Sequence, residues 1–385
     1  MILYGMRTSI QTGIDTFWGK RFGESGMIRN GTASGFCKAR AKLKPELFRW
    51  LSDEIVRRYE HAVGFPAWHG YTIFGIDGST VCLPQEDAVR REFYSGHNDK
   101  TPVARISQLT ELHTGAVLDV ALESLQVSEL ELALDHLDRL QPGSVVVMDR
   151  GYPAGHLFAY CEHRQLHYVA RVARNKFKLC EAFALAGDDL AETIVSMPHS
   201  KTSRRRMKAM GLPASDLRLR IIRVPLPDGK VDVLVTNLFD DTLTPHDFVE
   251  LYRKRWQCET TYRYEKCWGG SEHFTGKTVH SVYQDFFASV LLFNLVALTA
   301  TEADAKIDQS ARSQPRFANR VHLISQVRAY VVQLVLGTPS ACRRILNRII
   351  DVAAKTTTAI RPNRGIFPRR RRKANTTNVV VLGTS

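Results

Sequence analysis

The segment GYTIFGIDGSTVCLP, residues 70–84, decides the fold of this chain. Its residues are apolar on both alternating sides, which is typical of a strand that is buried on two faces. Asp77 interrupts the apolar run, and an unpaired carboxylate in a buried strand is costly. Asp77 therefore either ends the strand in a tight Asp-Gly turn or has a partner that compensates for its burial.

The segments beyond this strand predict how a sheet is completed. Residues 103–124 read as two strands joined at the turn His113-Thr114-Gly115, which makes an antiparallel meander. The next expected elements are a helix near 128–140, the strand SVVVMD (144–149), a helix near 154–165 and the strand HYVARV (167–172). A meander followed by this alternation predicts an α/β fold, a mixed sheet with helices on its faces. Residues 174–243 break the alternation and contain two further predicted strands, LRLRIIRVPL (217–226) and KVDVLVTNLF (230–239), around the turn Pro227-Asp228-Gly229.

Asp149 directly follows VVVM, at the carboxyl end of a predicted buried strand. Open α/β sheets tend to bind ligands at this edge. The alternative is an aspartate that only shapes the loop before Arg150 and Gly151.

A third carboxylate stands in the segment YRKRWQCETTYRYEK, residues 252–266, which we expect to be helical. At about 100° per residue, four residues share one narrow stripe, with Trp256 and Arg263 beside it. These four are Tyr252, Arg255, Glu259 and Lys266. The alternative is a solvated helix face with the ion pairs Arg255–Glu259 and Glu259–Arg263.

Asp77, Asp149 and Glu259 would converge if both strands end beside this helix. Hard oxygen ligands of this kind suit Mg²⁺ or Mn²⁺. A site with two such ions activates the attacking hydroxyl and stabilises the leaving oxygen in phosphodiester chemistry. The cations around Glu259 are then expected to bind phosphates.

The charge of the chain points to a polyanionic partner. The 385 residues carry a net charge of +14, and cations that neutralise phosphates gain affinity by releasing counterions. Nucleic acid is the first candidate. An anionic membrane is the second, but no clear basic amphipathic helix or lipid anchor supports it. The most apolar run, residues 286–300, is too short to span a membrane, contains Asn294 and is expected to be a buried helix.

Other site types find little support. Seven cysteines without a C-x-x-C pair suggest free thiols in a reducing compartment. Cys161, His163 and His167 lack a second ligand pair for zinc. The segment GGSEHFTGKT, residues 269–278, resembles a phosphate-binding loop but has the wrong glycine spacing and follows a helix.

Three motifs together resemble the DDE transposases of bacterial insertion sequences that carry the YREK signature. They are IDGST with Asp77, MDRGY with Asp149, and the spacing Y-x₂-R-x₃-E-x₆-K from Tyr252 to Lys266. The resemblance covers roughly residues 30–300 and includes ASGFCKARAKL near the start. Met148 is a departure, because many members have a small residue before this aspartate.

The resemblance implies a ribonuclease H-like mixed sheet flanked by helices and interrupted by a β-rich insertion. Asp77 would lie on the first strand, Asp149 on the fourth and Glu259 on a helix after the insertion. Five regions are expected: a helical, basic DNA-binding module (1–65), the first part of the catalytic core (66–173), the β-rich insertion (174–243), the second part of the core (244–300) and a helical region with a basic tail (301–385).

The implied activity is cleavage and strand transfer of DNA by a transposase with two Mg²⁺ or Mn²⁺ ions held by Asp77, Asp149 and Glu259. The expected DNA contacts are Tyr252, Arg255, Trp256, Arg263, Lys266 and Arg150, with Arg204, Arg205 and Arg206 in the basic run KTSRRRMK. The expected partners are the terminal inverted repeats and target DNA, bound by a homodimer, without a membrane, in the bacterial cytoplasm at the nucleoid. A nuclease without strand transfer and an inactive DNA-binding relative remain alternatives.

Overall fold

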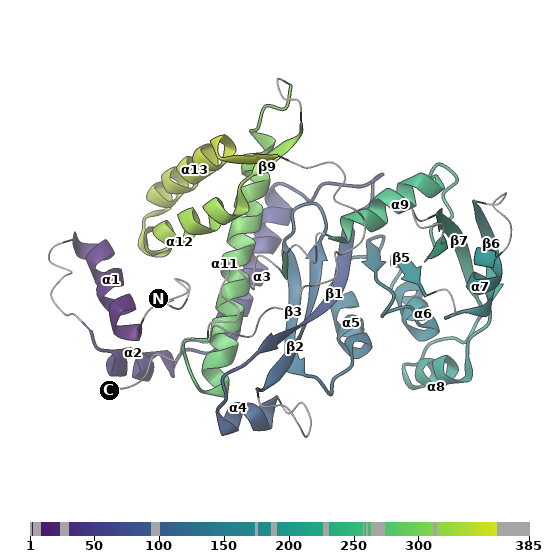
Figure 1. Ribbon diagram of the computed structural model, residues 1–385, viewed down its shortest axis with the longest axis horizontal. Coiled ribbons are helices and arrows are strands. Elements are labelled where there is room, and N and C mark those ends of the chain that lie inside the picture. The colour runs from purple at the N-terminus through teal and green to yellow at the C-terminus, as the bar shows by residue number, and fades with distance from the viewer. Residues whose placement is uncertain are drawn as a thin grey trace.

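One mixed sheet of eight strands organises the chain in the computed structural model (Figure 1). The structure describes residues 2, 9–23, 31–93, 101–173, 176–185, 191–225, 231–256, 258, 261–262, 274–310 and 314–359. The strand order is β3-β2-β1-β4-β5-β8-β7-β6. The strands are β1 (Ile73–Cys82), β2 (Val103–Glu111), β3 (Val117–Ser124), β4 (Val145–Met148), β5 (His167–Val172), β6 (Glu192–Met197), β7 (Leu217–Pro225) and β8 (Val231–Thr236).

The pairing of the strands confirms the expected mixed α/β sheet. β1, β2 and β3 form the antiparallel meander, and β4 is parallel to both β1 and β5. The strands of residues 174–243 extend this same sheet, because β8 pairs antiparallel with β5. β7 and β8 were expected from the sequence, whereas β6 was not. Their turn, Pro227-Asp228-Gly229, lies outside the described residues.

Helices cover both faces of the sheet around β4. On one face, Leu137, Phe158 and Met207 pack with Met148 and other core residues of the strands. Four helices cover this face, and each contributes residues to the same core: α5 (Glu129–Leu137), α6 (Gly155–His163), α7 (Lys178–Leu185) and α8 (Lys201–Ala209). On the opposite face lies α9 (Pro245–Lys254), whose Phe248 and Leu251 pack with the odd-numbered valines of β4. Successive side chains of a strand point to opposite faces, so Val146 and Met148 lie on one face of β4 and Val145 and Val147 on the other.

A long apolar helix, α11 (Val279–Ala305), packs together with α3 (Glu46–Ala62) beside the meander (Figure 1). It is long and apolar enough to cross a membrane, with a mean hydropathy of 1.7 over its most apolar window, but 78% of that window is buried inside the protein. The expectation that this segment is too short to span is therefore wrong, and the expectation of a buried helix is confirmed. Asn294 accepts from the Val117 amide at 2.7 Å and donates to the Val117 carbonyl at 2.8 Å, which satisfies the backbone at the start of β3.

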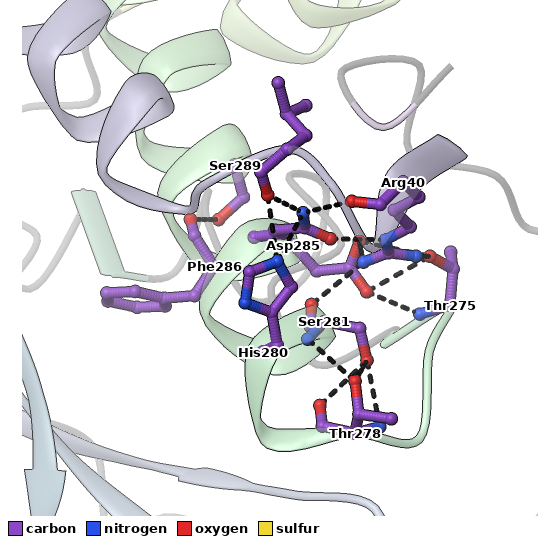
Figure 2. Close-up of polar contacts among 10 residues, drawn as sticks. Arg40, Thr275, Thr278, His280, Ser281, Asp285, Phe286 and Ser289 are labelled. Atoms are coloured by element: carbon purple, nitrogen blue, oxygen red, sulfur yellow. Dashed lines mark hydrogen bonds and ion pairs between the residues drawn. The ribbon is translucent and has the colours of Figure 1, made fainter. Parts of the chain in front are cut away.

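A buried arginine joins the N-terminal helices to α11. Arg40 ends α2 (Ala33–Arg40) and reaches the first turns of α11, as Figure 2 shows. It donates to Gln284 at 2.7 Å, to Thr275 at 2.6 Å and to Asp285 at 2.7 Å. Because these partners flank the start of α11, residues 31–62 are fixed to the centre of the molecule. α1 (Ile10–Phe22) precedes α2, and α4 (Asp87–Glu92) follows β1.

The C-terminal part of the described chain packs on the second half of α11. Ile324, Val327 and Ile349 bury their side chains against Val296 and Ala300. The elements here are α12 (Arg320–Leu336), α13 (Pro339–Lys355) and a small sheet of β9 (Arg316–Ala318) and β10 (Thr357–Ala359). The expected basic tail, residues 361–373, lies outside the described residues.

Candidate active site

The register of the sheet sets Asp77 and Asp149 side by side. Ile76 of β1 pairs in parallel with Met148 of β4. Asp77 and Asp149 each follow directly after these paired residues. Neighbouring strands lie about 4.8 Å apart, which brings the two side chains within reach of one ligand. By alternation along each strand, both point to the face that α9 covers.

The chain after α9 lies close on β1 because Gly75 has no side chain. A Cβ atom at Gly75 would lie 2.6 Å from Sγ of Cys258 and 2.8 Å from Leu112. Further along, the hydroxyl of Tyr262 donates to the backbone carbonyl of Asp77 at 2.6 Å. Cys258 and Tyr262 thus contact the strand that carries Asp77. Glu259 itself lies outside the described residues.

Tyr252 and Arg255 reach the two aspartates, one each. The hydroxyl of Tyr252 donates to Oδ1 of Asp149 at 2.8 Å. The guanidinium of Arg255 lies 3.6 Å from Oδ2 of Asp77 and 5.6 Å from the centre of the Tyr252 ring. Arg255 is only 6% exposed, so the alternative of a solvated helix face is wrong for this residue.

The expected continuous helix over residues 252–266 is also wrong in one detail. α9 ends at Lys254, and Arg255 is its C-terminal cap. The amides of Arg255 and Cys258 bond to carbonyls three residues earlier, at 3.1 and 2.9 Å, so the chain tightens at this point. The described residues 256, 258 and 261–262 are helical again, so among the described residues the predicted helix departs from regularity at Arg255 alone.

Cations keep Asp149 ionised despite its burial. Burial raises the pKa of the Asp149 carboxyl, but the charge of Arg255, the backbone amide of Arg150, the Tyr252 hydroxyl and the charge of Arg171 outweigh it and lower that pKa. Burial and the neighbouring Asp149 raise the pKa of Tyr252, so its hydroxyl stays protonated and donates.

The other predicted contacts divide into two groups. Arg150 lies beside Asp149 and donates to Asp232 of β8 at 2.6 Å, and Trp256 is half-buried after α9. The remaining described contacts are exposed on α8, whose Met207 packs on the face opposite α9, so they form a separate basic surface. These are Arg204, Arg205 and Arg206. Arg263 and Lys266 lie outside the described residues.

Sequence reasoning missed Arg171, Asp232 and Tyr152 near the aspartates. Arg171 is a charged residue in the otherwise apolar strand HYVARV, which was a usable signal. Tyr152 is 2% exposed, and its hydroxyl is buried without a hydrogen-bond partner among the described residues. Its burial, followed by the charges of Asp77 and Glu129, raises its pKa. Nothing in the sequence pattern distinguished Tyr152 from a core residue.

The carboxylates fit a divalent metal ion in donor type and placement. Asp77 and Asp149 supply hard oxygen donors from adjacent strands, and the Asp149 carboxyl favours its ionised form. The described residues, which leave out Glu259, hold no group of three or more side chains placed to bind a metal ion. The structure thus sets two of the three predicted metal ligands side by side, and the third, Glu259, lies outside the described residues.

Comparisons with known proteins point to one family. The family model described as transposase DDE domain matches residues 68–295. The transposase InsG for insertion sequence element IS4 of Escherichia coli strain K12 is 26% identical over 274 residues, which is 68% of this chain and 60% of the relative. The chain therefore spans about 60% of the length of this curated relative.

A solved structure also shows some likeness. It is a cryo-EM structure of the piggyBac transposase synaptic complex with hairpin DNA, with a TM-score of 0.42 and 11% identity over 73% of this chain and 57% of that chain.

Proposed function

Because the chain belongs to the family of transposase DDE domains, we propose that it binds the ends of an insertion sequence and cuts and joins DNA by metal-dependent phosphoryl transfer. One observation carries the proposal: the parallel register that sets Asp77 beside Asp149 on the face under α9. Two adjacent carboxylates bordered by arginines suit a phosphodiester substrate and a divalent cation together.

Asp77, Asp149 and Glu259 would hold two Mg²⁺ or Mn²⁺ ions. When bound, the ions supply charge that activates an attacking hydroxyl and stabilises the leaving oxygen. The tight approach of Cys258 to Gly75 and the bond from Tyr262 to Asp77 support placing Glu259 at the same site, because they bring the chain on both sides of it to β1.

Arg255 would bind a phosphate beside Asp77, and Tyr252 would orient a phosphate beside Asp149. The Arg255 side chain is buried, and its guanidinium lies over the Tyr252 ring. The side chain is therefore already held in place and would lose little conformational entropy on binding DNA. Arg150 and Lys266 would contact further phosphates, and Trp256 and Arg263 would contact displaced bases. The exposed arginines of α8 would bind the DNA backbone away from the cut.

The expected partners are the terminal inverted repeats of the element and a target duplex. Two copies of the chain would bring two ends together in one complex. We place this complex on the bacterial chromosome in the cytoplasm.

The test uses the full chain and labelled DNA that carries the inverted repeats flanking the gene. We expect cleavage at the ends and joining to a target with Mg²⁺, and neither with a chelator. The variants Asp77→Asn, Asp149→Asn and Glu259→Gln should each lose cleavage by at least about a hundredfold while still binding the ends. Asp241→Asn, at an exposed aspartate, serves as the control.

Three outcomes would change the proposal. End cleavage without joining would indicate a nuclease without strand transfer. End binding without cleavage by the parent chain would indicate an inactive DNA-binding relative. A variant of one carboxylate that cuts as fast as the parent would remove that residue from the site.

A further inference from the structure

Arg171 continues a row of charged residues that directly follow the last parallel residue pairs of β1, β4 and β5. Ala170 of β5 pairs with Met148 of β4, so Arg171 stands beside Asp149 as Asp77 does on the other side. Alternation places Arg171 on the same face as Val169, which packs in the core under α9. Three neighbouring strands thus present Asp77, Asp149 and Arg171 in one row.

A single carboxylate holds Arg171 and Arg150 together. Asp232 of β8 accepts from Nη2 of Arg171 in a short contact and from Nη2 of Arg150 at 2.6 Å. The Asp232 and Arg171 side chains are 12% and 19% exposed, while that of Arg150 is 47% exposed. Two guanidinium groups and one carboxylate carry a net charge of +1, which matches the single negative charge of a phosphodiester.

Arg171 also has hydrogen-bonding capacity left over. Its Nε is buried and has no hydrogen-bond partner within the part of the chain that the structure describes. A guanidinium presents its donors as a rigid fork that suits two oxygens of one phosphate.

We propose that Arg171 contacts a phosphate of the DNA strand beside Asp149, and that Asp232 is the positioning residue that holds Arg171 and Arg150 as a two-arginine phosphate clamp. This proposal rests on the proposed function, because it assumes that the row of Asp77, Asp149 and Arg171 faces a cleaved DNA strand. The competing interpretation is an ion pair that only links β5, β8 and the loop after β4.

The first measurement is single-turnover cleavage at saturating protein, together with end binding and thermal unfolding. Arg171→Gln should cut at least about tenfold more slowly than the parent at equal end binding. Arg171→Lys should recover part of the rate, because it keeps the charge without the fork. Asp232→Asn should slow cleavage less than Arg171→Gln does. Arg218→Gln, an exposed arginine on β7 whose guanidinium lies over Phe239, is the matched control and should cut like the parent.

The second measurement locates the phosphate. DNA carrying one neutral methylphosphonate at each position around the cut removes one backbone charge at a time. With a methylphosphonate at the contacted position, the parent should cut more slowly than it cuts unmodified DNA. Arg171→Gln should cut this DNA as fast as it cuts unmodified DNA, because the variant already lacks the interaction with that phosphate.

The outcomes separate this proposal from the proposed function. If the parent chain does not cut, the proposed function fails and the clamp fails with it. If the parent cuts and Arg171→Gln cuts equally fast, or if no methylphosphonate position is non-additive with Arg171→Gln, only the clamp is overturned. Variants that melt earlier but cut at the parent rate when folded would assign Arg171 and Asp232 to the ion pair alone.

Discussion

Asp119 of β3 is buried between groups that balance its charge. It is 6% exposed, accepts from Nη2 of Arg49 at 2.7 Å and lies 2.9 Å from Nδ1 of His136. The other ring nitrogen of His136 lies 3.0 Å from the hydroxyl of Ser107. Ser107, His136 and Asp119 have the order of a hydrolase triad, but Ser107 and His136 are 0% and 1% exposed. No substrate reaches them, so the network ties α3 and α5 to the meander.

We therefore expect Asp119→Asn to lower stability in a pH-dependent way. Burial raises the Asp119 pKa, but the hydrogen bond and charge of His136 and the charge of Arg49 outweigh it, so the folded-state pKa lies below the unfolded value of about 3.9. A lowered carboxyl pKa contributes stability above the unfolded pKa, and this stability is lost as the pH falls through the folded pKa.

Denaturant unfolding measures this difference. At pH 7 the variant should lose about 3 kcal/mol of unfolding free energy, because one partner of a buried charged network is removed. The gap to the parent should narrow as the pH falls below about 4, because the Asp119 carboxyl then protonates in the unfolded state before it does in the native state. Asp241→Asn, at the surface, should change little at either pH. A gap that stays constant down to the acid transition would show that the Asp119 charge contributes nothing.

At the scale of elements, the sequence predicted the strands whose apolar runs are bounded by turn residues. β1 to β5, β7 and β8 appear where their patterns indicate, and so do α5, α6 and α11. β6, with the sequence ETIVSM, was not predicted because Met197 is the only buried residue of this strand, and its pairing with β7 leaves no apolar run in the sequence. The tightening at Arg255 also escaped, because helical periodicity continues across it. Asp77 and Asp149 could be predicted as neighbours, whereas Arg171 depended on a strand register that no single sequence shows.

A second prediction follows from the close packing of the segment after α9 against β1. Gly75→Ala adds a methyl group 2.6 Å from Sγ of Cys258, so that chain must move away from the strand bearing Asp77. Overpacking of this kind costs about 1–3 kcal/mol of unfolding free energy. End cleavage should fall by more than end binding, because Tyr262 contacts Asp77 from the same segment.

A double variant tests the cause. Cys258→Ala alone removes the sulfur and should cost little activity, and Gly75→Ala with Cys258→Ala should recover part of both stability and cleavage. The new methyl group still lies 2.8 Å from Leu112 in the double variant, so recovery should be incomplete. If Gly75→Ala alone cuts and unfolds like the parent, the close approach of this segment to β1 does not position the site.

For the molecule as a whole, charge is distributed between a site and a separate surface. Near Asp77 and Asp149, Arg255 and Arg171 are partnered and largely buried on the α9 face, and Arg150 is partnered but exposed. The cations of α8 are exposed on the other face, where Ser203 and Met207 anchor the helix to the core. The net charge of +14 predicted a polyanionic partner but could not separate these two roles, because composition carries no information about burial.

The last prediction concerns this α8 surface, defined as Lys201, Arg204, Arg205, Arg206 and Lys208, which are all exposed. Arg206 lies 3.2 Å from Nε2 of the buried His156, so it is left in place. Replacing the other four with Gln should weaken binding to all DNA sequences. The slope of log K against log salt should become shallower by about 0.9 for each phosphate that these cations neutralise in the parent. Cleavage at saturating protein should stay near the parent rate, because none of the four lies in the row of Asp77, Asp149 and Arg171.

A matched variant separates the α8 surface from net charge in this experiment. It changes Arg343, Arg344 and Arg348 of α13, which are exposed cations on another helix. If both sets flatten the salt slope equally per charge removed, the effect belongs to net charge, because the position of the cations then makes no difference. If the α8 set leaves the slope unchanged, its cations are a solvated surface and the DNA lies elsewhere. Only a larger change for the α8 set assigns the DNA backbone to this face, since counterion release requires the phosphates to lie within reach of the replaced cations.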